Sequence, residues 1–463
     1  IGLAVQAAGV VHDARPCLHE LHSLSLIRTR ESTRDRLLEV YHDRLREVVQ
    51  SMLSEEERAG IDRDLFIALR AAGSTDCDWL HALAWAVDES ADAFRYGLQA
   101  AARASEKLAF ERAAELYDRC VMLAPDPSAN DGELWHKLAL AYSYAGHGGK
   151  AANTYLHAAE RVSATQRLLF ERAAASQLIC SGRFEEGEAL LVRVLDRLGL
   201  GAPRSEAGLY AAIGWERARL ALRGLSYKPR LRSELPFMDI FMAELCGLLS
   251  METAAYDPLR AALFQARCLR MVLELGEHEG VARGLSATAI ILSLEATERA
   301  QLRADQLLAK AEAIAERIDS SLARTNIASA RALRAYLTGR QAEAIDLCAQ
   351  AEHLLRTASA DSEYHHRFTI GAARIAALME LAHFQRAEAE LQIYLREAAQ
   401  TENISAALHV CLPHAWVDSN ANRARDAIAR LDRQREQLPR VGFGVLHVLH
   451  MAAVLRTGCM TGE

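Results

Sequence analysis

Apolar residues recur at intervals of three or four positions in several segments of the chain, which is the spacing of one face of an α-helix. In residues 42–53 the apolar positions are Leu45, Val48, Val49 and Met52. Ser54 and the glutamates after it predict the N-cap and acidic first turn of the next helix. Asp257 and Pro258 suit an N-cap and a first turn, so a further helix is predicted from there to about Leu275.

The most regular helical pair begins at Trp135, with a turn at Gly146 between its two helices. Its large and small positions are Trp135, Leu138, Ala139, Tyr142, Ala151, Tyr155 and Ala158. Small residues let two antiparallel helices approach closely, and large ones fill the space beside them. This pattern resembles the tetratricopeptide family, with weaker copies over most of residues 91–440. The resemblance implies a solenoid of helical hairpins, and an irregular helical bundle is the alternative.

The first 53 residues have a different pattern. Positions 36–41 suit a short strand, and positions 21–30 hold a second apolar run beside it. A helix, two short strands and a helix are therefore expected, an order that suggests the tail of a winged-helix domain. Glycines and prolines in residues 199–236 predict a mixed stretch of helix and loop.

These patterns predict an all-α fold in four segments. The segments are a winged-helix remnant at 1–53, a helical linker with tetratricopeptide-like repeats at 54–200, an irregular helical insert at 201–285, and degenerate repeats at 286–463. The chain begins at Ile1 and ends without a finishing helix, so both ends are expected to be cuts in a longer polypeptide, the last segment being truncated.

Composition fits this fold, since 51% of the 463 residues are hydrophobic and only 9 are proline. The net charge of −7 gives no general reason to expect nucleic acid or an acidic membrane surface as a partner. The chain has no apolar run near 18 residues, so no membrane span is predicted and a cytoplasmic location is expected.

The 9 cysteines are dispersed and never form a CxxC pair, which predicts reduced core cysteines, with Cys120 and Cys348 as small buried apolar residues. Cys17, His19 and His22 are close in sequence, but no second pair of ligands follows them, so no metal is expected there. The same holds for His365 and its neighbour His366.

Catalytic motifs are missing from the sequence. Gly148-Gly149-Lys150 resembles the end of a phosphate-binding loop, but Ala151 follows where a magnesium-binding Ser or Thr belongs, so a turn is predicted. The chain contains neither the HRD and DFG signatures of a kinase nor a GxSxG nucleophile motif. It is therefore predicted not to be an enzyme.

A second resemblance is carried by five segments in a fixed order: 41–47 (YHDRLRE), 108–117 (LAFERAAELY), 222–225 (LRGL), 257–262 (DPLRAA) and 264–267 (FQAR). Together they resemble the C-terminal half of bacterial multidomain regulators, in which a serine/threonine kinase precedes a signal-transducing ATPase of the STAND class and tetratricopeptide repeats. The resemblance implies that kinase and ATPase domains, with their ATP or ADP and magnesium, lie upstream of Ile1. No cofactor is expected in this chain.

The same resemblance implies a role for His42. Related ATPases carry a Met-His-Asp motif in the winged helix that touches bound ADP, and here Tyr41 stands in place of the Met. His42 would then sense the nucleotide state, and Asp43 would cap or orient the next helix. The alternative is that Tyr41 packs and His42-Asp43 only starts a helix.

Basic residues cluster at positions 217–232 with no acidic residue among them: Arg217, Arg219, Arg223, Lys228, Arg230 and Arg232. Guanidinium groups bind carboxylates and phosphates through paired hydrogen bonds, so this cluster suits an acidic domain or a phosphorylated segment. A solvated surface is the alternative. Nucleic acid is not expected, because Tyr227 is the only aromatic residue in the cluster.

The function expected from these patterns is a sensor arm of a kinase-linked signal-transduction ATPase. Such an arm would bind a protein or peptide in the concave groove of its repeats and contact the ATPase domain of its own chain. A free-standing scaffold or adaptor is the alternative. An enzyme in its own right is the third hypothesis, supported only by length and scattered His and Cys.

Overall fold

The computed structural model describes residues 13–31, 36–124, 132–295, 297–357, 364–440 and 442–462, with residues 5 and 8 isolated between gaps. Within this part, every element is an α-helix except one two-stranded sheet and a short 3-10 turn, so the all-α prediction is confirmed. The chain forms two compact units, Ile1–Ala145 with Thr154–Arg167 and Gly146–Asn153 with Leu168–Glu463. The segment boundaries predicted at 53, 200 and 285 stay predictions.

The first unit begins with a helix, a strand hairpin and a second helix: α2 (Arg15–Ser23), β1 (Ile27–Glu31), β2 (Arg36–Val40) and α3 (Asp43–Met52). The strands pair antiparallel, with Ile27 opposite Val40. The order predicted for this region is thus confirmed, and both β2 and α3 lie where the sequence places them. No residue of α2 or α3 is buried.

Consecutive helices pack against one another in the rest of the first unit. They are α4 (Glu55–Ala71), α5 (Cys77–Ala86), α6 (Ser90–Glu106), α7 (Phe110–Leu123) and α8 (Glu133–Tyr144), whereas α9 (Gly148–Ala159) and α10 (Ala164–Cys180) have residues in both units. The predicted N-cap is confirmed, since Ser54 Oγ accepts from Glu57 N at 3.2 Å and Glu57 accepts from Ser54 N at 2.9 Å. Helices α6 and α7 touch closely at Gly97, where a Cβ would lie 2.7 Å from Cys120 Sγ.

The second unit continues the helical series. Its elements are α11 (Phe184–Arg197), α12 (Glu206–Arg223), η1 (Arg232–Glu234), α13 (Phe237–Ala254), α14 (Pro258–Leu275), α15 (His278–Ser293), α16 (Glu298–Ile318), α17 (Ser321–Leu337), α18 (Gln341–Thr357), α19 (Tyr364–Glu380), α20 (Phe384–Gln400), α21 (Ile404–His409), α22 (Cys411–Asn420), α23 (Ala424–Glu436) and α24 (Val445–Thr461). The prediction for α14 is confirmed at both ends, and the Asp257 carboxylate accepts from Arg260 N at 3.1 Å.

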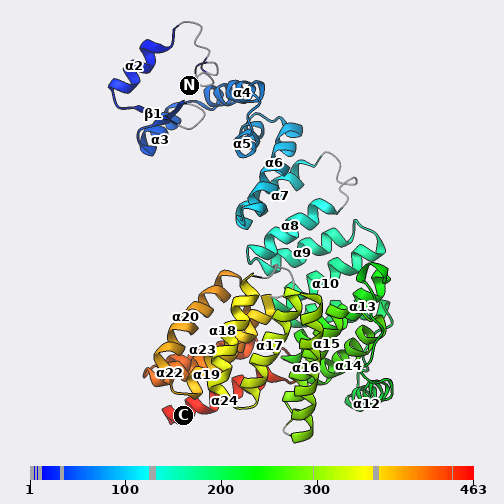
Figure 1. Ribbon diagram of the computed structural model, residues 1–463. Helices are drawn as coiled ribbons and strands as arrows, with labels where there is room; N and C mark the ends of the chain where they lie inside the picture. Colours follow the sequence, from blue (N-terminus) through cyan, green and yellow to red (C-terminus); the bar gives the residue numbers. More distant parts are fainter. Residues whose placement is uncertain are drawn as a thin grey trace. The chain divides into compact units, whose positions relative to one another are not determined.

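Neighbouring helices of the second unit pack in pairs: α13 with α14, α15 with α16, α17 with α18, and α19 with α20 (Figure 1). Successive pairs also touch, because α15 packs on α17 and α18 packs on α19. Alanines line many of these contacts, and Ala332, Ala335, Ala344 and Ala351 are fully buried. Small side chains on facing helices therefore set the close packing of the pairs.

One kind of turn joins many of these helices. Two positions before the second helix begins, a residue adopts a left-handed conformation with φ between 45° and 89°. These residues are Asp88, Leu108, Gly146, Gly182, Gly339, Ala382, Glu402 and Asn422. The next N–H bonds back to a carbonyl five residues earlier, as Arg340 N does to Ala335 O at 2.9 Å. This bond closes the end of one helix and reverses the chain.

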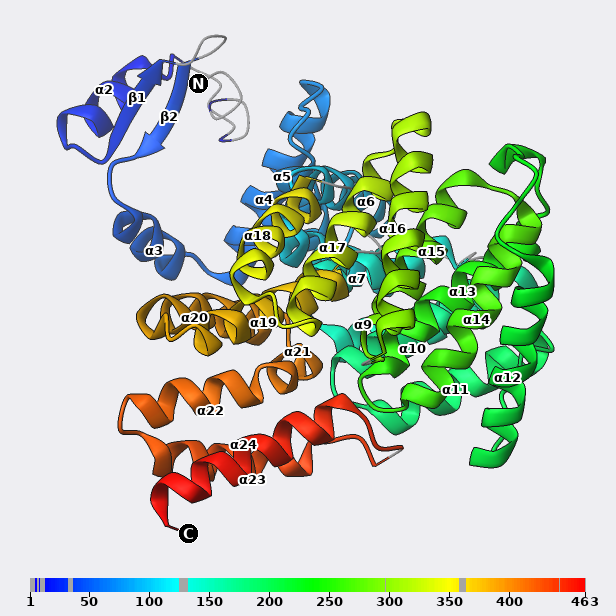
Figure 2. The same ribbon diagram turned by 60° about the horizontal axis from the view of Figure 1, so that its bottom comes forward.

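The last part of the second unit packs against its first part. Ile404 lies against Gly182, since a Cβ added to this glycine would be only 3.0 Å from the Ile404 side chain. Arg440 N donates a hydrogen bond to Glu185 Oε1 at 3.0 Å. Further along, Leu446 N donates to Ala255 O at 2.9 Å. Helices α22, α23 and α24 lie side by side beyond these contacts (Figure 2). The last helices of this unit therefore contact its first helices.

Replacing Gly339 by Ala is expected to lower the free energy of unfolding by about 1–2 kcal/mol, because φ is +77° there and L residues are strained in that region. A Cβ at this position would meet nothing within 4 Å, so the effect reports backbone strain alone. Urea unfolding followed by circular dichroism measures it. Gly60→Ala, inside α4 and equally open, is the matched control and should stabilise the protein by up to about 1 kcal/mol. Equal effects of the two substitutions would contradict this account.

Candidate functional site

His42 directly precedes α3, with extended backbone (φ −137°, ψ 138°), and its carbonyl accepts from Leu45 N at 2.9 Å. Its exposed ring lies edge-on to the ring of Tyr41, with 5.0 Å between centroids. Asp43 is not the N-cap expected from the sequence, because it lies in the first turn and pairs with Arg46 at 3.3 Å. Tyr41 is 47% exposed and His42 starts the helix, so both hypotheses for this stretch, nucleotide sensor and helix start, stay predictions.

The seven repeat-signature residues lie on α8 and α9, as the sequence predicts. Leu138, Ala139, Ala151, Tyr155 and Ala158 are buried. Trp135 is half-buried, with its ring 5.2 Å from that of His157 and 5.2 Å from the guanidinium of Arg161. Trp135 on α8 therefore packs against His157 in the second half of α9. The Gly148-Gly149-Lys150 run begins α9, so the prediction that it lies in the turn is wrong, and the left-handed residue of that turn is Gly146.

The basic cluster of residues 217–232 is divided by the fold. Arg223 donates to the carbonyls of Ser226 at 2.8 Å and Leu273 at 2.6 Å, and Arg232 pairs with Glu244 at 2.8 Å. These two side chains hold the segment after α12 against the rest of the unit. Their role in the cluster is structural.

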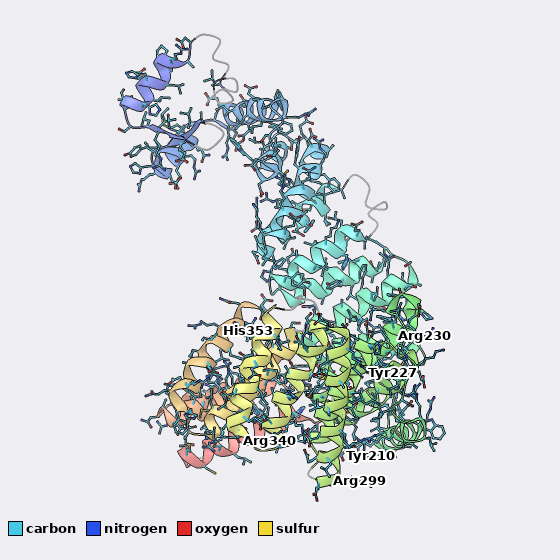
Figure 3. All side chains as sticks on the ribbon, viewed as in Figure 1. Tyr210, Tyr227, Arg230, Arg299, Arg340 and His353 are labelled. Atoms are coloured by element: carbon cyan, nitrogen blue, oxygen red, sulfur yellow. The ribbon has the colours of Figure 1, made fainter. Side chains whose placement is uncertain are left out.

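The other four basic residues remain at the surface. Arg217 and Arg219 lie 3.5 Å and 3.8 Å from Glu295 and Glu216. The exposed side chains of Lys228 and Arg230 form no ion pair within the part of the chain that the structure describes. Figure 3 shows Arg230 and Tyr227 on the segment that follows α12. This half of the cluster can receive an anionic group.

Two hollows lie on the second unit. One, of about 430 Å³, lies between α16, α17 and α18 and contains three arginines. Each is paired: Arg334 with Asp305 at 2.8 Å, Arg331 with Glu312 at 2.5 Å, and Arg340 with Glu343 at 2.8 Å. The other, of about 510 Å³, has a largely apolar lining that includes Leu169, Leu235, Phe237, Ile240 and Phe241. The predicted concave groove stays a prediction.

Six of the nine cysteines are buried, Cys180 is half-buried, and two are exposed. Cys120 and Cys348 are buried, and burial raises the pKa of each thiol to about 12, so both are inert core residues as predicted. Cys17 and Cys459 are exposed, so the core interpretation is wrong for these two, which lie near the ends of the described chain.

Metal-ligating side chains are not brought together in the part of the chain that the structure describes. Within the described residues, no group of three or more His, Cys, Asp or Glu could hold a metal ion. The side chains of His365 and His366 lie outside that part of the chain. Among the described helices, none combines the length and the apolar character needed to cross a membrane.

Glu252 is a buried acid that the sequence does not reveal. Its carboxylate lies on α13 and accepts from Ser176 Oγ at 2.6 Å. Burial raises the pKa of this carboxyl to about 7, against the opposing effects of the Ser176 hydrogen bond and the positive charge of Arg172. Glu252 therefore changes its charge near neutral pH inside the second unit.

Comparison with known proteins identifies no family. No protein-family model matches the chain, and no curated protein matches it significantly.

Glu252→Gln is expected to make stability less dependent on pH. The folded state holds the Glu252 proton above the ordinary carboxyl pKa of 4.5, so its contribution to stability is full below about pH 4.5 and falls as the pH rises through about 7. The loss is on the order of 3 kcal/mol at pH 8, and the glutamine variant should lack it. Urea unfolding at pH 5 and pH 8 measures both proteins. Exposed Glu316→Gln is the control, and wild-type pH dependence in the Glu252→Gln variant would refute the assignment.

Proposed function

We propose that this chain is a non-catalytic, partner-binding regulatory arm made of tetratricopeptide-like hairpins. The observation that carries the proposal is the recurrent left-handed turn, from Asp88 in the first unit to Asn422 in the second. One turn repeated between packed helix pairs is typical of repeat proteins, whose stacked hairpins offer an extended surface to proteins or peptides. A partner in the groove of these hairpins is part of the proposal.

The N-terminal element supports a link to another domain. Val48, Val49 and Met52 on α3 are 48%, 56% and 78% exposed, and no residue of α2 or α3 is buried. Apolar side chains in a small helix–strand–strand–helix element need a cover. We assign this element to the end of a winged-helix domain, covered by an ATPase domain of the same polypeptide, which a serine/threonine kinase domain would precede.

His42 is the residue through which this arm would sense the nucleotide. Its exposed ring can donate a hydrogen bond to a phosphate, and ATP or ADP with magnesium would be held by the ATPase domain. Partner binding would shift an off/on equilibrium only if the partner bound the two states with different affinity. A cytoplasmic location belongs to the same proposal.

The second candidate is a free-standing scaffold or adaptor protein. The same stacked hairpins support it, since they need no ATPase to present a binding surface. The uncovered apolar face of α3 favours the regulatory arm over the scaffold, because an independent scaffold would leave this face in water.

In the full-length protein encoded by the gene, His42→Ala is expected to raise basal ATP hydrolysis several-fold, because a contact that holds the ADP state is lost. Steady-state phosphate release measures the effect, and His19→Ala, on the exposed surface of α2, is the control. Unchanged hydrolysis and unchanged ADP affinity would remove the sensor role. If the coding sequence contains no ATPase domain, the free-standing scaffold is the candidate function that remains.

A further inference from the structure

Helix α16 separates its charges onto two edges. Arg299, Arg303, Lys310 and Arg317 follow one another at intervals of four, seven and seven residues, which places them along one edge. The acidic residues Asp305 and Glu312 lie on another edge and pair with arginines of α17. The cations of α16 thus face away from the acids of their own helix.

The segment after α12 runs beside this basic edge. Lys310 Nζ donates to Leu225 O at 2.6 Å, and Arg217 lies 3.5 Å from Glu295, just before α16 begins. Tyr227 follows Leu225 closely in the chain. Burial raises the pKa of Tyr227, and the positive charge of the nearby Arg317 acts against this rise. The cations of α16 and the segment that follows α12 therefore form one basic surface.

Most cations of this basic surface lack a carboxylate partner. Within the described chain, Arg299, Arg303, Lys228 and Arg230 have no ion pair, and Arg317 bonds only to the carbonyl of Ala313 in its own helix. The exceptions are Arg217, whose contact with Glu295 is long and exposed, and Arg219, which lies 3.8 Å from Glu216. Exposed pairs of this kind contribute little, so Arg217 can exchange its partner.

Lys310 shows that the cations crowd one another. Its ammonium group is partly buried and bonded to a neutral carbonyl, and burial together with the positive charge of Arg303 lowers the pKa of Lys310. An incoming carboxylate would offset this repulsion and form charge-assisted hydrogen bonds. The surface is therefore complementary to a negative group, although Glu277 beside Tyr227 and Glu295 beside Arg217 already approach it.

We propose that the basic surface of α16 and residues 217–230 binds a carboxylate-rich segment of a partner protein. The proposal rests on the partner-binding role proposed above and names the chemistry of the partner. From Arg299 to Arg317 the edge is about 27 Å long, which matches about eight residues of extended peptide. A protein segment is favoured over nucleic acid because the chain carries a net charge of −7, and acids such as Glu295 flank the single row of cations.

Fluorescence anisotropy with a labelled ten-residue peptide of alternating Glu and Ala tests the proposal on the whole chain. The peptide should bind, with affinity that falls as salt rises, and the triple variant Arg299→Gln/Arg303→Gln/Lys310→Gln should lose tenfold or more. The matched control Arg425→Gln/Arg433→Gln/Arg435→Gln removes the same charge from exposed positions of α23 and should bind like the wild type. Circular dichroism confirms that both variants fold.

Three outcomes would overturn the proposal: no binding of the peptide, equal losses in the two triple variants, or tighter binding of a ten-nucleotide single-stranded DNA through the same α16 residues. Failure here is separable from failure of the regulatory role. The His42 experiment measures that role at the other unit and does not involve α16.

Discussion

The fold depends on a chain reversal that a single left-handed residue makes possible. That residue lets the following N–H reach a carbonyl five residues back, so one helix ends as the next begins antiparallel to it. Close pairing then requires small side chains on the facing surfaces, which Ala332, Ala335 and Ala344 supply. Position and composition act together, because the turn fixes where the helices meet and the alanines fix how near they come.

Local signals made part of the fold predictable. Three helix boundaries depend only on residues within one turn of the boundary, so the sequence shows them directly. They are the cap at Ser54, the start of α14 at Asp257 and the end of α14 at Leu275. Leu108 and Ala382 adopt the same left-handed turn without the glycine that would announce it. Burial of Glu252 escapes prediction because it is decided by α10, which is distant in sequence.

The candidate sites were likewise predictable only where they depend on local sequence. The basic run at 217–232 is visible in sequence, yet the contacts of Arg223 and Arg232 with distant carbonyl and carboxylate oxygens make these two structural. The spacing of the cations on α16 is also visible in the sequence. That α16 lies beside the basic run at 217–232 depends on the tertiary contact between Lys310 and Leu225, which the sequence does not show. The position of His42 at a helix start was predictable, whereas its exposure depends on what covers α3.

The contacts that join Gly182 to Ile404 and Glu185 to Arg440 alter how the second unit can come apart. An open stack of hairpins melts from its tips, one hairpin after another, because the outermost pair has a neighbour on one side only. Here the last hairpins contact the first, so both ends of the series have a neighbour and unfolding has no unsupported hairpin at which to begin. Hydrogen exchange in α20–α24 should then resemble that in the middle of the unit.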